Sequence, residues 1–229
     1  MPVKLDFNHS STRLFCLFLA TDLAFIIIHI LYEYTDLISS VLFSIEQDRG
    51  YAEMFQYIKE YWIAILLLLL AFNQRTLLYL GWSLLFFYLL LDDSLEIHEW
   101  LGGSISYRLG IPPAFNLRPI DFGEIIVSGC VAVFFLSFIG ITYRFGDRFA
   151  RATSRYLIGM LFALAVFGIV VDLLHIAIQV PILAPIFALL EDGGEMIVMS
   201  VIAGFVFLRF EQLYSKLNPL KKPEHTWDA

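Results

Sequence analysis

The sequence predicts an all-α membrane protein: a polytopic bundle of six transmembrane helices with both termini in the cytoplasm. Three observations lead to this fold class. Hydrophobic residues make up 59% of the chain and the mean hydropathy is +0.75, whereas soluble domains are about half apolar. Six apolar stretches reach the roughly 18 residues that a membrane-crossing helix needs. Finally, Lys and Arg are distributed unevenly between the connecting segments, which is typical of cytoplasmic loops.

The first three spans follow one another with short connections. The first, Arg13–Tyr34, is too long and too polar for a cleaved signal peptide. The second, Met54–Phe72, is the weakest, because its first turn carries Lys59 and Glu60. The polar tripeptide at 73–75 then forms a turn into the third span, Thr76–His98.

The remaining three spans are Asp121–Tyr143, Arg155–Gln179 and Pro185–Phe210. The fourth opens with Asp121 and Glu124, which suits the positive end of a helix dipole. The six spans make one membrane domain at 13–212, between cytoplasmic tails at 1–12 and 213–229. The long segment 102–124 is expected to be a loop that caps the outer side of the bundle.

Basic residues set the predicted orientation. With a cytoplasmic N-terminus, eleven of the 15 Lys and Arg residues fall in cytoplasmic segments and four, namely Arg49, Lys59, Arg108 and Arg118, fall outside. The net charge is −7, and the sequence has no basic patch of the density that nucleic-acid binding needs, so no nucleic-acid partner is expected. Cys16 and Cys130 lie inside spans and form neither a disulfide framework nor a metal motif.

Acidic residues and histidines recur at one depth, the outer part of the bilayer. Two octapeptides show this most clearly: LLDDSLEI begins at residue 90 and LLEDGGEM at residue 189. Helix geometry places Asp92, Glu96 and Glu99 within about 60° of one another on the third span. Comparable stripes join His29 and Glu33 on the first span, Asp172 and His175 on the fifth, and Glu191 and Glu195 on the sixth. Such stripes must face the bundle interior or water.

These acids need something to offset their charge. Each carboxylate in the membrane costs roughly 2.5–3.5 kcal/mol, and no span has a Lys or Arg in its middle. Protonation, a water-filled cavity or bound metal ions are the three ways to meet this cost. The pattern resembles the inward-facing ligands of di-metal four-helix bundles and favours two divalent ions of iron, manganese or zinc. The candidate ligands are His29, Glu33, Asp92, Glu96, His98, Glu99, Asp172, His175, Glu191 and Glu195, with Asp93 and Asp192 as candidate general bases.

The stretches LLLDDSLEIHEWLG and LLEDGGEM resemble those of a group of bacterial multi-pass membrane proteins, which carry an LDD-x-x-x-IHE and a later ED-x-x-EM motif. The resemblance implies a bacterial inner-membrane location and singles out the same acidic positions together with His98. It implies no mechanism. On a regular helix His98 would point about 120° away from Asp92.

Three functions are compatible with these features. The favoured hypothesis is a metal-dependent membrane enzyme, a hydrolase or an oxidoreductase, acting on a membrane lipid or another apolar substrate. The first alternative is a proton or cation transporter or channel, since acids inside a membrane also mark ion pathways. The second is a non-catalytic sensor or subunit. The sequence leaves open whether the chain forms a homo-oligomer.

Overall fold

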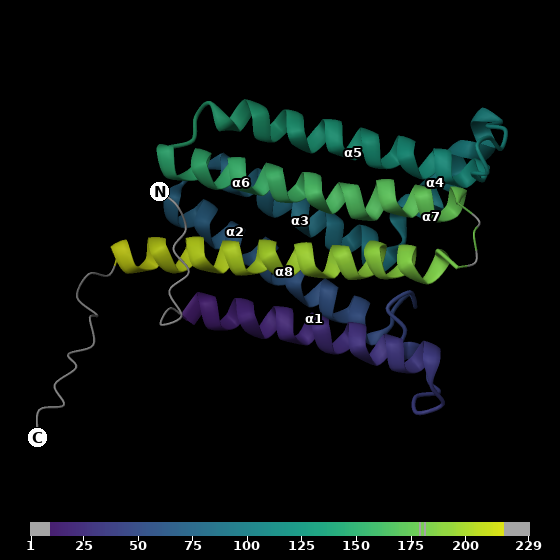
Figure 1. The fold of residues 1–229 in the computed structure, drawn as a ribbon. Coiled ribbons are helices and arrows are strands. Elements are labelled where there is room, and N and C mark those ends of the chain that lie inside the picture. The colour runs from purple at the N-terminus through teal and green to yellow at the C-terminus, as the bar shows by residue number, and fades with distance from the viewer. Residues whose placement is uncertain (1–9, 179, 181, 218–229) are drawn as a thin grey trace, which may run out of the picture.

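A computed structural model describes residues 10–178, 180 and 182–217, and these residues form a bundle of nearly parallel and antiparallel helices (Figure 1). Among these residues, six helical segments are long and apolar enough to cross a membrane, which confirms the predicted all-α bundle of six spans. Their helices are α1 (Ser10–Tyr34), α2 (Tyr51–Gln74), α3 (Leu77–Leu95), α5 (Pro119–Tyr143), α6 (Arg148–Ala165) continuing into α7 (Asp172–Ala177), and α8 (Ala184–Leu217). Most of the two predicted tails, and the last residue of the fifth predicted span, Gln179, lie outside the described residues.

Local sequence sets the ends of several helices. Arg75 adopts a left-handed conformation with φ of 50° and ends α2. Thr76 then caps α3, because its side chain accepts a hydrogen bond from the Leu78 amide. Asp147 caps α6 in the same way through the Ala150 amide at 2.6 Å. These caps produce the short turns between consecutive spans.

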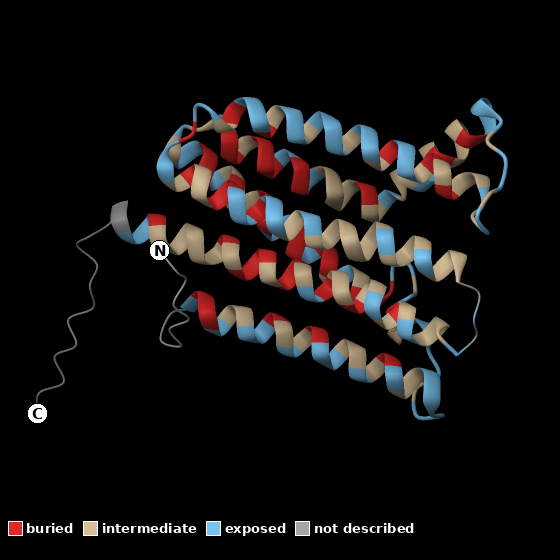
Figure 2. Cartoon of the chain, turned by 45° about the horizontal axis from the view of Figure 1, so that its top comes forward, coloured by how far each residue is buried: buried red, intermediate tan, exposed pale blue. Residues whose placement is uncertain are grey.

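The helices pack as a central group with two peripheral members. α2 contacts α3 and α8, and α8 also contacts α1 and α6. α5 packs on α3 and on the short helix α4 (Ile97–Leu109). Figure 2 shows that exposed residues cover the outer faces of α1 and α5, and only 17% of the apolar window in each is buried. These faces suit contact with lipid.

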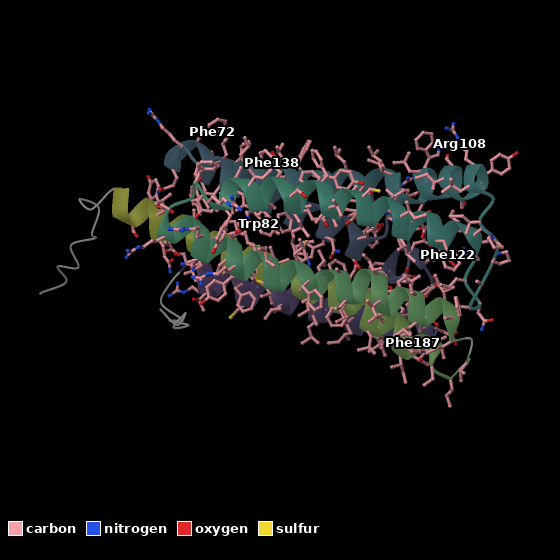
Figure 3. All side chains as sticks on the ribbon, turned by 90° about the horizontal axis from the view of Figure 1, so that it is seen from above. Phe72, Trp82, Arg108, Phe122, Phe138 and Phe187 are labelled. Carbon is pink, nitrogen blue, oxygen red and sulfur yellow. The ribbon has the colours of Figure 1, made fainter. Side chains whose placement is uncertain are left out.

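The apolar core fills the half of the bundle near Ser10 and Leu217. Its largest buried side chains include Trp82, Tyr79, Phe86 and Leu157. In Figure 3, Trp82 and Phe138 lie in this half, whereas Phe122 and Phe187 lie toward the other end. We call that other end, where α3, α5 and α8 turn at Leu95, Pro119 and Ala184, the acidic end, because the acidic residues of the predicted layer lie there.

The predicted third span and the loop after it need correction. The span does not run on to His98: α3 ends at Leu95, and Glu96 adopts a left-handed conformation with φ of 53°. Much of the segment predicted as a loop is helix α4, which packs against α5. The two backbones cross closely at Gly102 and Gly123, where an added Cβ would collide with the facing chain. Helical periodicity carries no signal for a single left-handed residue, so the break was not predicted.

The fifth span is also irregular. Between α6 and α7 the helix widens into a π-helical stretch, Val166–Val171. Such bulges are rare and are frequent at functional sites. Gly168 in this stretch faces Glu195, one of the acidic residues of α8.

Candidate functional site: an acid-lined cavity

A cavity of about 710 Å³ opens at the acidic end and extends into the bundle. Its size falls in the range of cavities that hold small molecules. Nine of the twelve predicted site residues line it: Asp92, Asp93, Glu96, His98, Glu99, Asp172, Glu191, Asp192 and Glu195. The folding of the chain therefore brings together acids from α3, α4, α7 and α8.

Six further acids line the same cavity and were not predicted to belong to the site: Glu46, Asp48, Glu53, Glu60, Asp121 and Glu124. Against these fourteen carboxylates stand two basic lining residues, His98 and Arg118. The guanidinium of Arg118 is already bound to Asp121, with Nη2 2.7 Å from Oδ1. The cavity is thus strongly acidic.

The deepest acidic part of the cavity, which we call the cavity floor, consists of Gln56, Glu60, Asp93 and Glu195. Glu60 is fully buried, and its carboxylate oxygens accept no hydrogen bond from a basic, amide or hydroxyl group among the described residues, although its carboxyl group lies within hydrogen-bonding reach of that of Asp93. Its charged neighbours include Asp93 and Glu195. Gln56 donates from Nε2 to Glu195 at 3.5 Å, while its Oε1 is buried without a partner. Buried polar groups without partners are rare in native proteins, so the floor is suited to bind something.

Room for the Glu195 carboxylate comes from Gly168 in the π-helical stretch. A Cβ at position 168 would collide with Glu195 Oε1, and the nearest other atoms it would meet also belong to Glu195. The glycine and the widened helix turn thus leave space for this acid on the facing helix α8. A lone glycine in an apolar span gave no signal of this role.

The helix break at Glu96 divides the predicted stripe on the third span. Glu96 lines the cavity and pairs with Arg49, with Nη2 2.8 Å from Oε1. Conversely, His98 is brought back toward Asp92: its amide donates to Oδ1 at 2.9 Å, and Nδ1 lies 3.3 Å from Oδ2. The expectation that Asp92, Glu96 and Glu99 share one face of a continuous helix was wrong for this reason, and the same break brings His98, one of the candidate ligands, to the side of Asp92.

The pKa values of three side chains in and near α4, outside the membrane spans, differ from their ordinary values. The hydrogen bond with Asp92 raises the pKa of His98 to about 9, although burial acts in the opposite direction. Burial raises the pKa of Glu99 above its ordinary value. The hydrogen bond to Asp121 raises the pKa of Arg118. His98 and Arg118 are therefore positively charged at neutral pH.

A buried ion pair lies just below the floor and contradicts the expectation that no span holds a basic residue at depth. Lys59 on α2 is fully buried, and its Nζ lies 3.0 Å from Asp22 Oδ1, 2.9 Å from the Met196 carbonyl and 3.2 Å from Ser200 Oγ. Ser200 in turn donates to Asp22 Oδ2 at 2.5 Å. We call Asp22, Lys59 and Ser200 the buried triad. Asp22 is the nearest partner of the Lys59 ammonium group, so the charge of Lys59 is largely matched within the triad and offsets little of the charge of the cavity acids.

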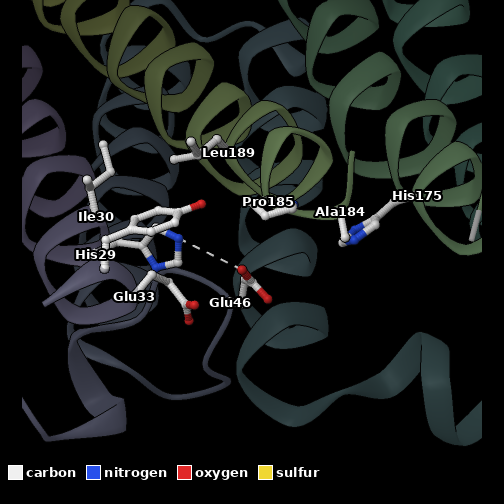
Figure 4. A pocket seen from close by; sticks show the side chains of 9 residues that line it. His29, Ile30, Glu33, Glu46, His175, Ala184, Pro185 and Leu189 are labelled. Carbon is white, nitrogen blue, oxygen red and sulfur yellow. Dashed lines mark ion pairs between the residues drawn. The ribbon is translucent and has the colours of Figure 1, made fainter. Parts of the chain in front are cut away.

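The three remaining predicted residues, His29, Glu33 and His175, line a smaller pocket of about 190 Å³ beside the cavity (Figure 4). His29 Nε2 lies 3.8 Å from Glu46 Oε1, and its Nδ1 accepts from the Ile45 amide at 3.3 Å. His175 lies on the opposite side of the pocket (Figure 4). Its Nδ1 is 2.8 Å from Glu191 Oε2, which links the pocket to the cavity.

These groups do not form a ready-made metal site. Across residues 10–178, 180 and 182–217, no three His, Cys, Asp or Glu side chains are placed so that they could hold one ion. The predicted ligands are divided between the cavity and the small pocket, and several already pair with one another. Any shared ion would require side chains of the floor to rotate toward it.

Comparison with known proteins gives a family without an assigned function. Residues 13–209 match the model described as Domain of unknown function (DUF8692), which covers most of the chain, so the chain belongs to this family. A search of curated proteins finds no match, and neither does a search of solved structures.

Proposed function

We propose that this member of the DUF8692 family is a metal-dependent membrane enzyme, a hydrolase or an oxidoreductase, whose reaction takes place in the acid-lined cavity. The observation that carries the proposal is the cavity floor, where Glu60 is fully buried beside Asp93 and Glu195 and accepts no hydrogen bond from a basic, amide or hydroxyl group among the described residues. Burying unpaired charges is costly, and a bound cation is one way to offset it. Among the described residues, the basic side chains that line the cavity are His98 and Arg118, and each of them is already paired with an aspartate.

The donor set indicates the kind of ion. Carboxylates of Glu60, Asp93 and Glu195, with the amide oxygen of Gln56, supply oxygen ligands that suit manganese, magnesium or ferrous iron. The pair His175 and Glu191 adds an imidazole and a carboxylate that suit a second ion of iron, manganese or zinc. A bound ion of this kind activates water or O₂. Asp192, which lines the cavity, is the candidate general base.

The same geometry supports an assignment of the two faces of the membrane. The bundle end near Ser10 and Leu217 carries most of the basic residues that lie at helix ends and turns, including Arg144, Arg148 and Arg151. We place this end in the cytoplasm and the acidic end at the extracytoplasmic face of a bacterial inner membrane. Reporter fusions at residue 145 and at residue 111 test the assignment, because only the first should report a cytoplasmic location.

Ion transport is supported less well. A transport route would have to continue from the floor through the other half of the bundle, where the apolar core is fully packed around Trp82, Leu67 and Val206. The buried triad closes the route between α1, α2 and α8. Flux of protons or divalent ions in proteoliposomes that Glu60→Gln abolishes would favour a transporter over an enzyme.

Metal content tests the enzyme proposal. We expect protein purified without chelators to hold about one equivalent or more of a divalent ion, measured by mass spectrometry of the metals. Glu195→Gln should lower this content, because it removes a charged ligand from the floor. Glu96→Gln is the matched control: it makes the same chemical change at a side chain paired with Arg49, and should leave the content unchanged. Wild-type protein with less than about a tenth of an equivalent would contradict the proposal.

A further inference from the structure

The cavity has a second, apolar part that its acidic residues do not explain. Away from the acidic end it continues between α5 and α6, where Val131 and Phe135 face it from α5, and Ile158 and Leu161 face it from α6. We call the part of the cavity that these four residues line the apolar arm. It lies near the middle of two membrane-crossing helices, so it is at the depth of the hydrocarbon chains.

The apolar arm is open to the side. Leu136 on α5 and Phe162 on α6 line the cavity and are also 42% and 71% exposed. α5 packs mainly on α3 and α4, whereas α6 packs mainly on α8 and α3, so α5 and α6 are not packed strongly against each other. The exposed side chains of Leu136 and Phe162 therefore form the outer edge of the apolar arm, where it meets the membrane.

The charge of the acidic part of the cavity determines which lipid head group it can bind. Fourteen carboxylates line the cavity against His98 and Arg118. Two bound divalent ions would add four positive charges, which still leaves the cavity acidic. An anionic head group would be repelled, whereas an ammonium group would be attracted and could donate hydrogen bonds to several carboxylates.

We propose that the cavity binds an amine-bearing lipid, which enters sideways from the membrane between α5 and α6. Its hydrocarbon chain lies in the apolar arm and its ammonium group lies among the carboxylates. The inference rests on the proposed function in that this lipid would be the substrate of the same cavity. Its experimental test is separate, because lipid binding and metal content are measured independently.

The test fills the apolar arm by substitution. Ala132→Trp places a large ring in the cavity lining, whereas Val133→Trp adds a similar ring on the outer face of the same helix, where Val133 is 69% exposed and does not line the cavity. Native mass spectrometry of the full chain, released from nanodiscs, measures retained phosphatidylethanolamine against phosphatidylglycerol. We expect wild type and Val133→Trp to retain the amine lipid preferentially, and Ala132→Trp to bind it about tenfold more weakly, equal to about 1.4 kcal/mol.

Equal retention of both lipids, or equal binding by the two variants, would overturn the proposal. If Ala132→Trp does not fold, wild-type protein gives the answer: a phosphatidylethanolamine carrying a photoreactive group in its chain should label Leu161, and a phosphatidylglycerol probe should not. Labelling of Leu161 by both probes alike refutes the amine preference. Metal content measured on the same samples separates the two proposals, since wild type that holds metal without selecting the amine lipid leaves the enzyme proposal standing.

Discussion

Substitution of Gly168 by alanine probes the fit between the π-helical stretch and Glu195. In an ordinary helix interior, alanine is favoured over glycine by about 1 kcal/mol. Here the added Cβ would collide with the Glu195 carboxylate, and forcing a group into occupied space costs about 1–3 kcal/mol. We therefore expect Gly168→Ala to lower the free energy of unfolding by up to about 2 kcal/mol.

A double-mutant cycle isolates this contact. Glu195→Ala removes the Cγ, Cδ and Oε1 atoms that the new Cβ would meet, so in that background Gly168→Ala should stabilise the protein by up to about 1 kcal/mol. The coupling between the two positions should reach about 1–3 kcal/mol. Reversible unfolding by sodium dodecyl sulfate in mixed micelles, followed by circular dichroism, gives all four free energies.

Gly159→Ala is the control, because a Cβ there meets nothing within 4 Å. It should be neutral or slightly stabilising. The reasoning fails if Gly168→Ala behaves like the control in the wild-type background, or if its effect is the same with and without the Glu195 side chain.

Three further expectations concern other contacts. Lys59→Met leaves Asp22 buried without its partner and should destabilise the protein by about 3–5 kcal/mol, whereas Lys59→Met combined with Asp22→Asn should recover part of this loss in the same unfolding assay. Because the pair with Asp92 raises the folded-state pKa of His98 to about 9, its stabilisation is complete below the unfolded value of about 6.5 and is lost as pH rises through about 9. The midpoint of thermal unfolding of metal-free protein should fall over this window, and His98→Gln should remove that part of the slope. Gly123→Ala should separate α5 from the α4 backbone and cost about 1–3 kcal/mol, which unfolding of the purified variant measures.

The fold was largely predictable because span length and hydropathy depend on composition alone. All six spans were found, and their bounds differ most in the fifth and sixth, where α6 begins at Arg148 rather than Arg155 and α8 runs on to Leu217 rather than Phe210. The left-handed Glu96 and the π-helical stretch are both single local events inside apolar sequence, and no periodic pattern reports them. Each of them changes which acidic side chains lie next to one another in the cavity.

The depth of the site in the membrane was predictable from the sequence, but the full set of residues that line it was not. Acids repeated at one level on several spans indicate a common layer, and nine of the predicted residues do line one cavity. Lys59 and Glu60 were taken as signs of a weak span, although the fold buries both completely. Their partners, Asp22 and the residues of the floor, lie on other helices, so only the tertiary arrangement reveals that this polar turn belongs inside.

The buried triad has a consequence for how the protein is made. α1 leaves the ribosome before α2 and carries Asp22 into the bilayer before Lys59 has been inserted. An acid at that depth costs roughly 2.5–3.5 kcal/mol on insertion scales, and this cost persists until α2 arrives alongside. Ser200 follows only with α8. Biogenesis should therefore keep α1 and α2 together, as a hairpin held at the translocon or by a chaperone, and release them to the lipid only when α8 docks.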